Sequence, residues 1–276
     1  MNYKESSFET KDNLNIFYRI WKVENPKGIV QIFHGFGEHS GRYQHVAKKL
    51  NSRGFIVVAD DHRGHGKSEG VRNHAKSFFE YVEDEKILTD IITKEYKNLP
   101  LFILGHSMGS IIAYSYAIKY QDKIKGMILS GTGTRNSTNP VILNPIVIFL
   151  GTVAPKLRLP SMLDPNGLSY NKENVEKYIN DTLVNYKTAT CALGKNFVTH
   201  YKKVKEQLKQ ITVPILMQYG KDDTTMIGQE ELFNSFGSEN KKKIVYDNCK
   251  HEIYNEIFED GKGAIEDMIQ WIESLC

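Results

Sequence analysis

The pentapeptide Gly105-His106-Ser107-Met108-Gly109 carries the clearest chemical signal in the chain. One apolar run ends just before it at Leu104, and another begins just after it at Ile111. A Gly-x-Ser-x-Gly turn between a strand and a helix raises the serine hydroxyl above the end of a sheet, where a base can reach it. The glycines keep Cβ atoms away from neighbouring backbone. The pattern predicts that Ser107 is a nucleophile; the alternative is a glycine-rich turn with a buried serine.

A serine hydroxyl needs a base to activate it, and the base needs an acid to orient it. In proteins with this turn, the acid and the base follow the serine along the chain. The apolar run 214–219 leads into Gly220-Lys221-Asp222-Asp223. We expect Asp223 to be the acid, because the spacing Gly-x-x-Asp lets the glycine turn the chain before the carboxylate points inward. Asp222 is the alternative acid. A further alternative is an ordinary surface turn that uses both aspartates and has no catalytic role.

The base is expected in a loop after the next strand. The run 244–246 is followed by such a loop, which contains His251. Of the nine histidines, His200 and His251 lie beyond the serine, and His200 falls within a predicted insertion. We therefore predict His251 as the base, although a lone histidine on a loop often has no such role.

An oxyanion would need two backbone N–H groups aimed at the place where negative charge develops. The N–H of Met108, directly after the serine, is the first candidate. The second is the N–H of Phe36, in the glycine-containing loop 34–43 that follows the apolar run 29–33.

Several elements must position these groups. Strand-like apolar runs occupy residues 14–21, 29–33, 55–59, 101–104, 127–129, 214–219 and 244–246. Helical spacing of apolar residues predicts helices over 43–52, 78–96, 172–183 and 264–275. Alternating strands and helices predict a three-layer α/β fold, with a mostly parallel sheet, right-handed crossovers and helices on both faces.

The alternation breaks between residues 135 and 211. This region shows helical patterns and loops, with no clear strand, and opens with the apolar stretch 141–150. We expect residues 1–134 and 212–276 to form the core domain and residues 135–211 to form an inserted helical cap. The apolar stretch either packs as core or lines an acyl tunnel and touches a lipid surface. Val147, Phe149 and Leu150 are the candidate substrate contacts.

The loop 34–43, the segment 61–70 (Asp-His-Arg-Gly-His-Gly-Lys-Ser-Glu-Gly) and the turn 105–109 together resemble the monoacylglycerol lipase and lysophospholipase branch of the α/β-hydrolases, which is serine aminopeptidase S33-like. The resemblance covers nearly the whole chain and is weakest in the cap. It implies a serine hydrolase that cleaves acyl esters of glycerol or lysophospholipids. It also implies Ser107, Asp223 and His251 as the triad, and the N–H groups of Phe36 and Met108 as oxyanion donors.

Two positions depart from the family pattern. Ser110 follows the turn where a glycine is common, which puts the local packing of helix on strand in question. Phe36 is bulky where relatives often have a small residue, and this would narrow the acyl slot.

Other polar residues favour structural roles. His62 and His65 could suggest a metal site, but their loop offers no third ligand at plausible spacing, so we predict no metal. Asp61 and Arg63 are expected to pair with each other and brace the end of the sheet. The polar residues of the oxyanion loop could bind a head group, but bracing of the loop is the favoured interpretation; they are Glu38, His39 and Arg42.

Composition excludes several classes of protein. The 36 basic and 33 acidic residues are interspersed, and the net charge of +3 does not indicate a nucleic-acid-binding surface. The three cysteines are too few and too widely spaced for a disulfide framework. The polar N-terminus lacks the apolar core of a signal peptide, and no run reaches the roughly 18 apolar residues of a membrane span. We expect a cytoplasmic protein, peripheral at membranes if the cap touches lipid.

These observations together predict a serine carboxylester hydrolase that uses an acyl-enzyme, with no metal or organic cofactor. Its partner would be a small acyl ester or lipid, and the oligomeric state is left open. Because the base must be neutral, activity should fall below about pH 6–6.5. Three enzyme alternatives share the same residues: an acyltransferase, a thioesterase and a cofactor-free haloperoxidase. A non-catalytic ligand-binding module is the alternative from another class.

Overall fold

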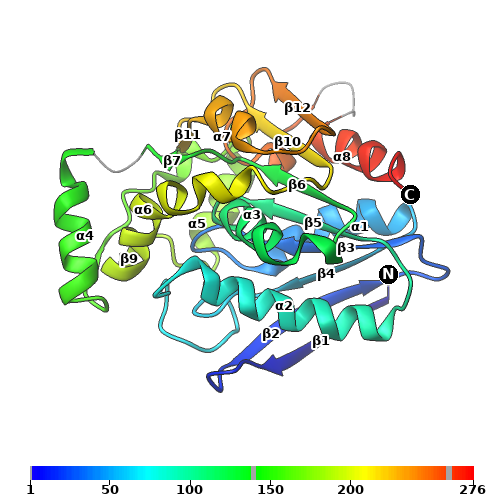
Figure 1. Ribbon diagram of the computed structural model, residues 1–276, viewed down its shortest axis with the longest axis horizontal. Coiled ribbons are helices and arrows are strands. Elements are labelled where there is room, and N and C mark those ends of the chain that lie inside the picture. Colours follow the sequence, from blue (N-terminus) through cyan, green and yellow to red (C-terminus); the bar gives the residue numbers. More distant parts are fainter. Residues whose placement is uncertain (1, 138–140, 259–262) are drawn as a thin grey trace.

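An eight-stranded sheet forms the centre of the computed structural model, which describes residues 2–137, 141–258 and 263–276 (Figure 1). Its strand order is β1-β2-β4-β3-β5-β6-β10-β12. The strands are β1 (Asn2–Glu9), β2 (Asn15–Lys22), β3 (Gly28–Phe33), β4 (Phe55–Asp60), β5 (Leu101–His106), β6 (Gly126–Ser130), β10 (Ile215–Gly220) and β12 (Lys241–Tyr246).

The strands from β4 to β12 in this order run parallel, whereas β1 and β2 are antiparallel additions at one edge. Strands β3, β4, β5, β6 and β10 are buried along their whole length. Strands covered on both faces are apolar without alternation, which explains the continuous apolar runs in the sequence. The sequence analysis missed β1, because this edge strand buries Phe8 but exposes most of its other residues.

Helices cover both faces of the sheet (Figure 1). Helices α1 (Gln44–Ser52) and α8 (Ala264–Glu273) pack into the apolar core on one face. The core on the other face receives α2 (Phe78–Glu95), α3 (Met108–Tyr120), α6 (Cys191–Leu208) and α7 (Gln229–Ser235). The predicted three-layer α/β architecture is confirmed.

The segment between β6 and β10 contains α4 (Asn144–Val153), α5 (Lys172–Asn180) and α6. In Figure 1, α4 lies at the margin of the molecule, away from the sheet. The sequence analysis expected no clear strand in this segment, but the structure contains short ones. Strand β8 (Arg158–Pro160) pairs with β9 (Thr188–Thr190), and β7 (Arg135–Asn136) pairs with β11 (Met226–Ile227). Strands of two or three residues are too short to show a periodicity.

The boundaries 135 and 211 remain a prediction. The C-terminal half of α6 joins the same core as α3 through Val204 and Leu208, so this helix connects the insertion to the sheet. Short 3-10 helices complete the described chain: Ser40–Tyr43, Gln121–Lys123, Val141–Leu143, Pro165–Gly167 and Ile253–Asn255. Among the helices that the structure describes, none combines the length and the apolar character that a membrane crossing requires.

Candidate active site

Ser107 lies in a strained turn between β5 and α3. Its backbone has φ 52° and ψ −116°, a conformation that residues with a side chain rarely adopt. Its N–H donates to the carbonyl of Ser130, at the end of the neighbouring strand β6, over 2.9 Å. The side chain therefore stands at the carboxyl end of the sheet, as the Gly-x-Ser-x-Gly pattern predicted.

Close packing explains the two glycines of this turn. A Cβ on Gly109 would lie 1.9 Å from the carbonyl oxygen of Phe33, and a Cβ on Gly105 would lie 2.4 Å from that of Gly109. Real Cβ atoms do not approach backbone atoms so closely. The start of α3 can therefore sit directly against the end of β3, which carries the predicted oxyanion loop.

Ser110 is accommodated without loss of packing. It is fully buried, and its hydroxyl donates to the carbonyl of Ser107 over 2.6 Å and lies 2.7 Å from the hydroxyl of Thr132. The departure from glycine thus adds a hydrogen-bonded link between the turn and the segment after β6.

Asp223 and His251 come together behind this turn. Nδ1 of His251 lies 2.8 Å from Oδ2 of Asp223. Oδ1 of Asp223 accepts from the N–H groups of Thr225 and Met226, at 2.8 and 3.2 Å. Both oxygens of the carboxylate are thereby fixed, and the imidazole carries its Nδ1 proton toward Asp223 with Nε2 facing away.

Gly220, at the end of β10, sets the position of the histidine loop. A Cβ there would lie 2.1 Å from the carbonyl oxygen of Cys249 and 2.2 Å from that of Lys250. The N–H of Asp222 donates to the carbonyl of Cys249 over 3.0 Å. The acid loop and the histidine loop are thus held together by backbone contacts. The side chain of Asp222 points elsewhere and accepts a hydrogen bond from Tyr170 at 3.2 Å.

The electrostatics of this pair favour a charged carboxylate and a basic imidazole. Burial opposes charge on Asp223, but His251 and the two N–H donors outweigh it and lower the pKa of the carboxyl. Burial also disfavours the imidazolium, but the charge and hydrogen bond of Asp223 outweigh it and raise the pKa of His251 above 6.5. An imidazole with a raised pKa is a stronger base once it is neutral.

Ser107 and His251 line one cavity, together with the predicted oxyanion residue Phe36. Within the described part of the chain, the Ser107 hydroxyl forms no hydrogen bond with the imidazole. Such contacts are often long before a substrate binds. The His251 ring packs closely against Gly131, where a Cβ would lie 3.1 Å from the imidazole Cε1.

The two predicted oxyanion donors belong to segments next to Ser107. Met108 is the first residue of α3, and N–H groups in the first turn of a helix have no partner within it. The loop that contains Phe36 touches Ser107, since a Cβ on Gly35 would lie 3.3 Å from the Ser107 Cβ. The N–H of Gly35 donates to Glu38 over 2.6 Å, whereas the N–H of Phe36 has no hydrogen-bond partner among the described residues.

The cavity has a volume of about 270 Å³ and a mostly apolar lining. Much of the lining comes from the insertion and from the segment after β10, and its larger aliphatic and phenyl side chains are Leu143, Val147, Leu159, Met162, Leu163, Leu168, Phe197 and Met226. Val147 is part of this lining, and its contact with a substrate stays a prediction. Phe149 is 62% exposed and, like Leu150, is not part of the lining.

Sequence reasoning missed a buried ion-pair network behind the site. Arg42 pairs with Glu38 and with Glu252, the residue after His251. The bracing role favoured for Glu38 and Arg42 agrees with these contacts, but Glu252 was not singled out. A glutamate directly after the candidate base was the available signal, although nothing in the sequence shows that Arg42 reaches it.

The expected pair of Asp61 and Arg63 does not form. Asp61 pairs with Arg19 of β2 at 2.8 Å, and Arg63 pairs with Asp84 of α2 at 2.6 Å. Each of the two residues finds its partner on a different element.

The argument against a third ligand near His62 also fails. The carboxylates of Asp60 and Glu85 lie close to its imidazole, whereas His65 belongs to no such group in the described part of the chain. The three cysteines are free; Cys191 and Cys249 are buried, and Cys276 is exposed.

Comparisons with known proteins find relatives along nearly the whole chain. The family model described as serine aminopeptidase, S33 matches residues 24–257. The monoacylglycerol lipase of Mycolicibacterium smegmatis is 32% identical over 275 residues, which cover 98% of this chain and 97% of that protein. The human monoglyceride lipase is 32% identical over 268 residues, which cover 95% and 88%. The crystal structure of Paleococcus ferrophilus monoacylglycerol lipase matches with a TM-score of 0.83 and 30% identity, covering 100% of both chains.

Proposed function

The chain belongs to the serine aminopeptidase S33 family, and from that premise we propose that it hydrolyses the ester bond of monoacylglycerols with Ser107, Asp223 and His251 as its catalytic residues. The hydrogen bond of Asp223 to His251, which lines an apolar cavity together with Ser107, carries this proposal. The relatives of similar length that are named as lipases of the same substrate support it.

The residues divide the reaction into two steps. The Ser107 hydroxyl attacks the ester carbonyl while neutral His251 takes its proton at Nε2 and later passes it to the leaving glycerol oxygen. Asp223 holds the imidazole in the required tautomer and stabilises its cation. A water that His251 deprotonates then attacks the acyl-enzyme and releases the fatty acid, and the proton returns to Ser107.

The N–H groups of Phe36 and Met108 are proposed to stabilise the oxyanion in both steps. Each such donor is worth about 2.7–4 kcal/mol in the transition state. The Phe36 ring packs edge-on against Phe197, with ring centroids 6.1 Å apart, and this contact fixes the loop that carries its N–H.

The apolar walls favour an acyl chain as the group that fills the cavity. Val147 is proposed to contact that chain, because it comes from α4 and lines the cavity. The polar end of the same space holds Glu38, His106 and Glu252 and is proposed to face the glycerol.

Fluorophosphonate labelling and substrate assays test the assignment. The wild type should react with the probe and release fatty acid from a monoacylglycerol, and Ser107→Ala should lose labelling and about 10⁶-fold in kcat. Ser161→Ala is the matched control, because Ser161 lines the same cavity but hydrogen-bonds to the carbonyl of Tyr186; it should keep labelling. Equal labelling of wild type and Ser107→Ala would disprove the nucleophile.

Four substrates separate the related activities. Initial rates with a monoacylglycerol, a lysophospholipid, an acyl thioester and a short p-nitrophenyl ester should be highest with the monoacylglycerol. A faster thioester would indicate a thioesterase, and transfer of the acyl group to added alcohol in place of water would indicate an acyltransferase. If none of the four substrates is turned over, the protein would be a non-catalytic ligand-binding module.

The exposed face of α4 is proposed to touch the lipid aggregate that holds the substrate. Ile146, Phe149 and Val153 are 55%, 62% and 59% exposed, and they recur at helical spacing. Phe149→Glu should reduce hydrolysis of micellar monoacylglycerol and leave a monomeric short ester unaffected. Ile257→Glu, which changes a 77% exposed residue outside α4, should alter neither rate. Equal losses on both substrates in Phe149→Glu would contradict the surface contact.

A further inference from the structure

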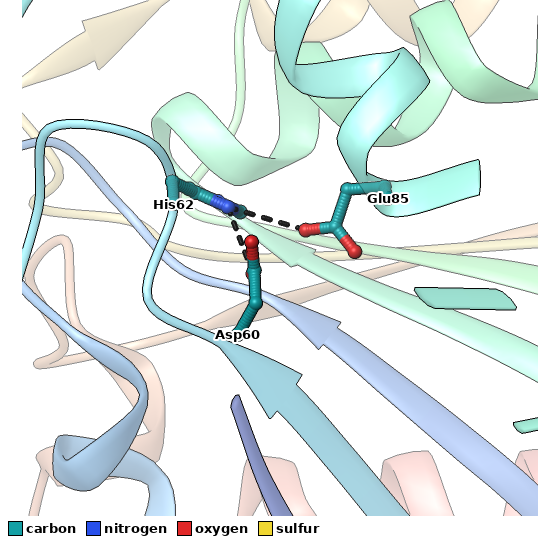
Figure 2. Close-up of side chains that lie close together, drawn as sticks. All are labelled: Asp60, His62 and Glu85. Carbon is teal, nitrogen blue, oxygen red and sulfur yellow. Dashed lines mark ion pairs between the residues drawn. The ribbon is translucent and has the colours of Figure 1, made fainter. Parts of the chain in front are cut away.

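Three side chains meet beneath the sheet end, outside the cavity of the proposed active site. Asp60 is the last residue of β4, His62 follows in the next loop, and Glu85 comes from the middle of α2 (Figure 2). All three are almost completely buried, with exposed fractions of 0%, 1% and 0%. Figure 2 shows both carboxylates directed toward the imidazole.

The distances within this cluster suit the coordination shell of a small cation. His62 Nδ1 lies 3.0 Å from Asp60 Oδ1 and 3.2 Å from Glu85 Oε1, and one ligand atom from each residue lies within 4.8 Å of the others. In a tetrahedral site with ligands about 2.0–2.1 Å from the metal, neighbouring ligand atoms are roughly 3.3 Å apart. The two distances measured are within a few tenths of an ångström of that separation.

Several of these buried atoms have no hydrogen bond. Both oxygens of Asp60, Oε1 of Glu85 and Nδ1 of His62 are without a hydrogen-bond partner in the described structure. Burying an unpartnered carboxylate is costly unless another group compensates its charge. Apart from the ion-pair contacts of His62 Nδ1 with the two carboxylates, these atoms have no polar partner in the described structure, and they face one another where solvent does not reach.

The outer contacts hold these atoms in place. Nε2 of His62 lies 3.2 Å from the carbonyl oxygen of His34, which directs Nδ1 toward the two carboxylates. The side-chain amide of Gln31 donates to Oε2 of Glu85 over 2.6 Å and leaves Oε1 facing the cluster. Metal-binding histidines commonly donate their second N–H to a carbonyl, and metal-binding carboxylates are held by such hydrogen bonds.

The neighbouring cation does not neutralise the cluster. Arg63, one residue beyond His62, is already paired with Asp84 and Asp12. In the described chain, Asp60 and Glu85 form ion-pair contacts with His62 alone. A metal ion between the three side chains would balance the charge of the two carboxylates.

We propose that Asp60, His62 and Glu85 bind a divalent transition-metal ion, Zn²⁺ by preference, as a structural site. One imidazole nitrogen and carboxylate oxygens are ligands that Zn²⁺ accepts, and closed four-coordinate sites are typical of structural zinc. The second oxygen of Asp60 would complete the shell by bidentate binding, which distorts the site from an ideal tetrahedron. Mg²⁺ fits less well, because it keeps several waters and the cluster is closed to solvent.

Such an ion would join three elements that support the proposed active site. It would tie β4 to α2 directly, and through His62 it would reach His34, whose ring stacks on that of His62 with centroids 3.9 Å apart. His34 is the first residue of the loop that carries Phe36. The ion would therefore stabilise the fold near the oxyanion loop without touching the substrate.

Metal content after refolding is the direct test. The protein is unfolded in guanidinium with a chelator and refolded with Zn²⁺. Excess metal is then removed, and bound Zn²⁺ is measured by mass spectrometry. We expect about one ion per chain, and a melting temperature roughly 5–10 °C higher than without metal at a free concentration near 100 Kd. Crystals of the same preparation should give an anomalous peak between the three side chains.

Variants separate this site from other metal-binding groups. Asp60→Asn and Glu85→Gln should lose the ion. Glu83→Gln, the same change two residues earlier on α2 in a residue that binds Lys11 and Lys119 at the surface, should retain it. If the two cluster variants fail to fold, the anomalous peak of the wild type decides. Three results would overturn the proposal: no bound ion in the refolded wild type, equal metal content in all variants, or an anomalous peak elsewhere. A proton, rather than a metal ion, would then be the positive charge that the cluster shares.

Discussion

Arg42 and Glu252 form a two-pronged ion pair, in which Nη1 and Nη2 each lie 2.8 Å from one carboxylate oxygen. The side chains are 10% and 4% exposed. Burial opposes the charge of Glu252, but Arg42 outweighs it and holds the pKa of that carboxyl far below its usual value. Arg42 also binds Glu38, whose Oε1 accepts the N–H of Gly35, so one guanidinium connects the loop after the candidate base with the candidate oxyanion loop.

Removal of this guanidinium should destabilise the protein and impair the site. Arg42→Ala leaves two buried carboxylates without their cation, and breaking a buried pair in this way costs about 3–5 kcal/mol. We expect a loss of that size in the free energy of unfolding in urea, with a fall in kcat for the variant that remains folded.

Arg53→Ala provides the matched control. Arg53 also contacts two glutamates, Glu266 and Glu273, but its side chain is 38% exposed. Surface pairs contribute about 0–1 kcal/mol, so this variant should be close to the wild type. Equal losses in the two variants would show that burial of the Arg42 network has no special effect.

Asp223→Asn should lower kcat by about 10⁴-fold. The amide can no longer hold the imidazole with its proton on Nδ1, and loss of the correct tautomer has an effect of this order in serine hydrolases. Asp222→Asn changes the adjacent residue, which contacts Tyr170 and not the imidazole, and should leave kcat within about twofold. A larger loss of kcat in Asp222→Asn than in Asp223→Asn would indicate that Asp222, and not Asp223, is the catalytic acid.

The pH dependence of kcat/KM should have an acid limb with a midpoint above pH 6.5. His251 accepts the serine proton only when neutral, and Asp223 raises the pKa of His251 above the ordinary 6.5. Activity therefore rises as the pH passes upward through this raised pKa and is lost below it. The limb lies higher than the pH 6–6.5 expected for an unperturbed histidine. In Asp223→Asn the midpoint should move down. Rates that stay constant to pH 5 would contradict the role of His251.

The parts of the fold that were predictable are those that bury both faces. Strands β3, β5 and β10 are apolar at nearly every position, because helices cover them on each side. The turn at Ser107 was predictable for a related reason: two backbone segments approach so closely there that glycines are required. In both cases a local physical demand leaves a mark in the sequence.

Partnerships between distant residues left no such mark. Arg42 and Glu252 lie 210 positions apart, and the sequence gives each charged residue many alternative partners. For the same reason, the predicted pair of Asp61 and Arg63, which are two residues apart, was wrong. The cluster at His62 was missed because Glu85 reaches it from α2, and a search for ligands at short spacing does not include a helix 23 residues away.

Thiol reactivity should separate the cysteines. Cys249, two residues before His251, is buried, and burial raises the pKa of its thiol to about 11. Since the thiolate is the reactive form, Cys249 should stay inert in the folded protein. A chromogenic disulfide reagent should modify one thiol rapidly, and Cys276→Ser should abolish that phase, because Cys276 is exposed. Rapid modification of Cys249 in the native state would indicate that its loop opens.

Gly109→Ala should prevent the turn at Ser107 from forming in its present geometry. The new methyl group would lie 1.9 Å from the carbonyl oxygen of Phe33, which belongs to β3 and cannot move without shifting the sheet. Overpacking typically costs about 1–3 kcal/mol and more where the backbone must give way, so we expect a loss of about 3 kcal/mol in stability together with loss of probe labelling. Gly167→Ala is the matched control, because the nearest atom to its new methyl group would be the hydroxyl of Thr225 at 3.7 Å, an ordinary contact. The free energy of unfolding of that variant should lie within about 0.5 kcal/mol of the wild-type value, and the variant should keep its labelling by the probe. A stable, labelled Gly109→Ala protein would show that α3 can retreat from β3 without disturbing Ser107, and the glycine would then have no role in positioning the nucleophile.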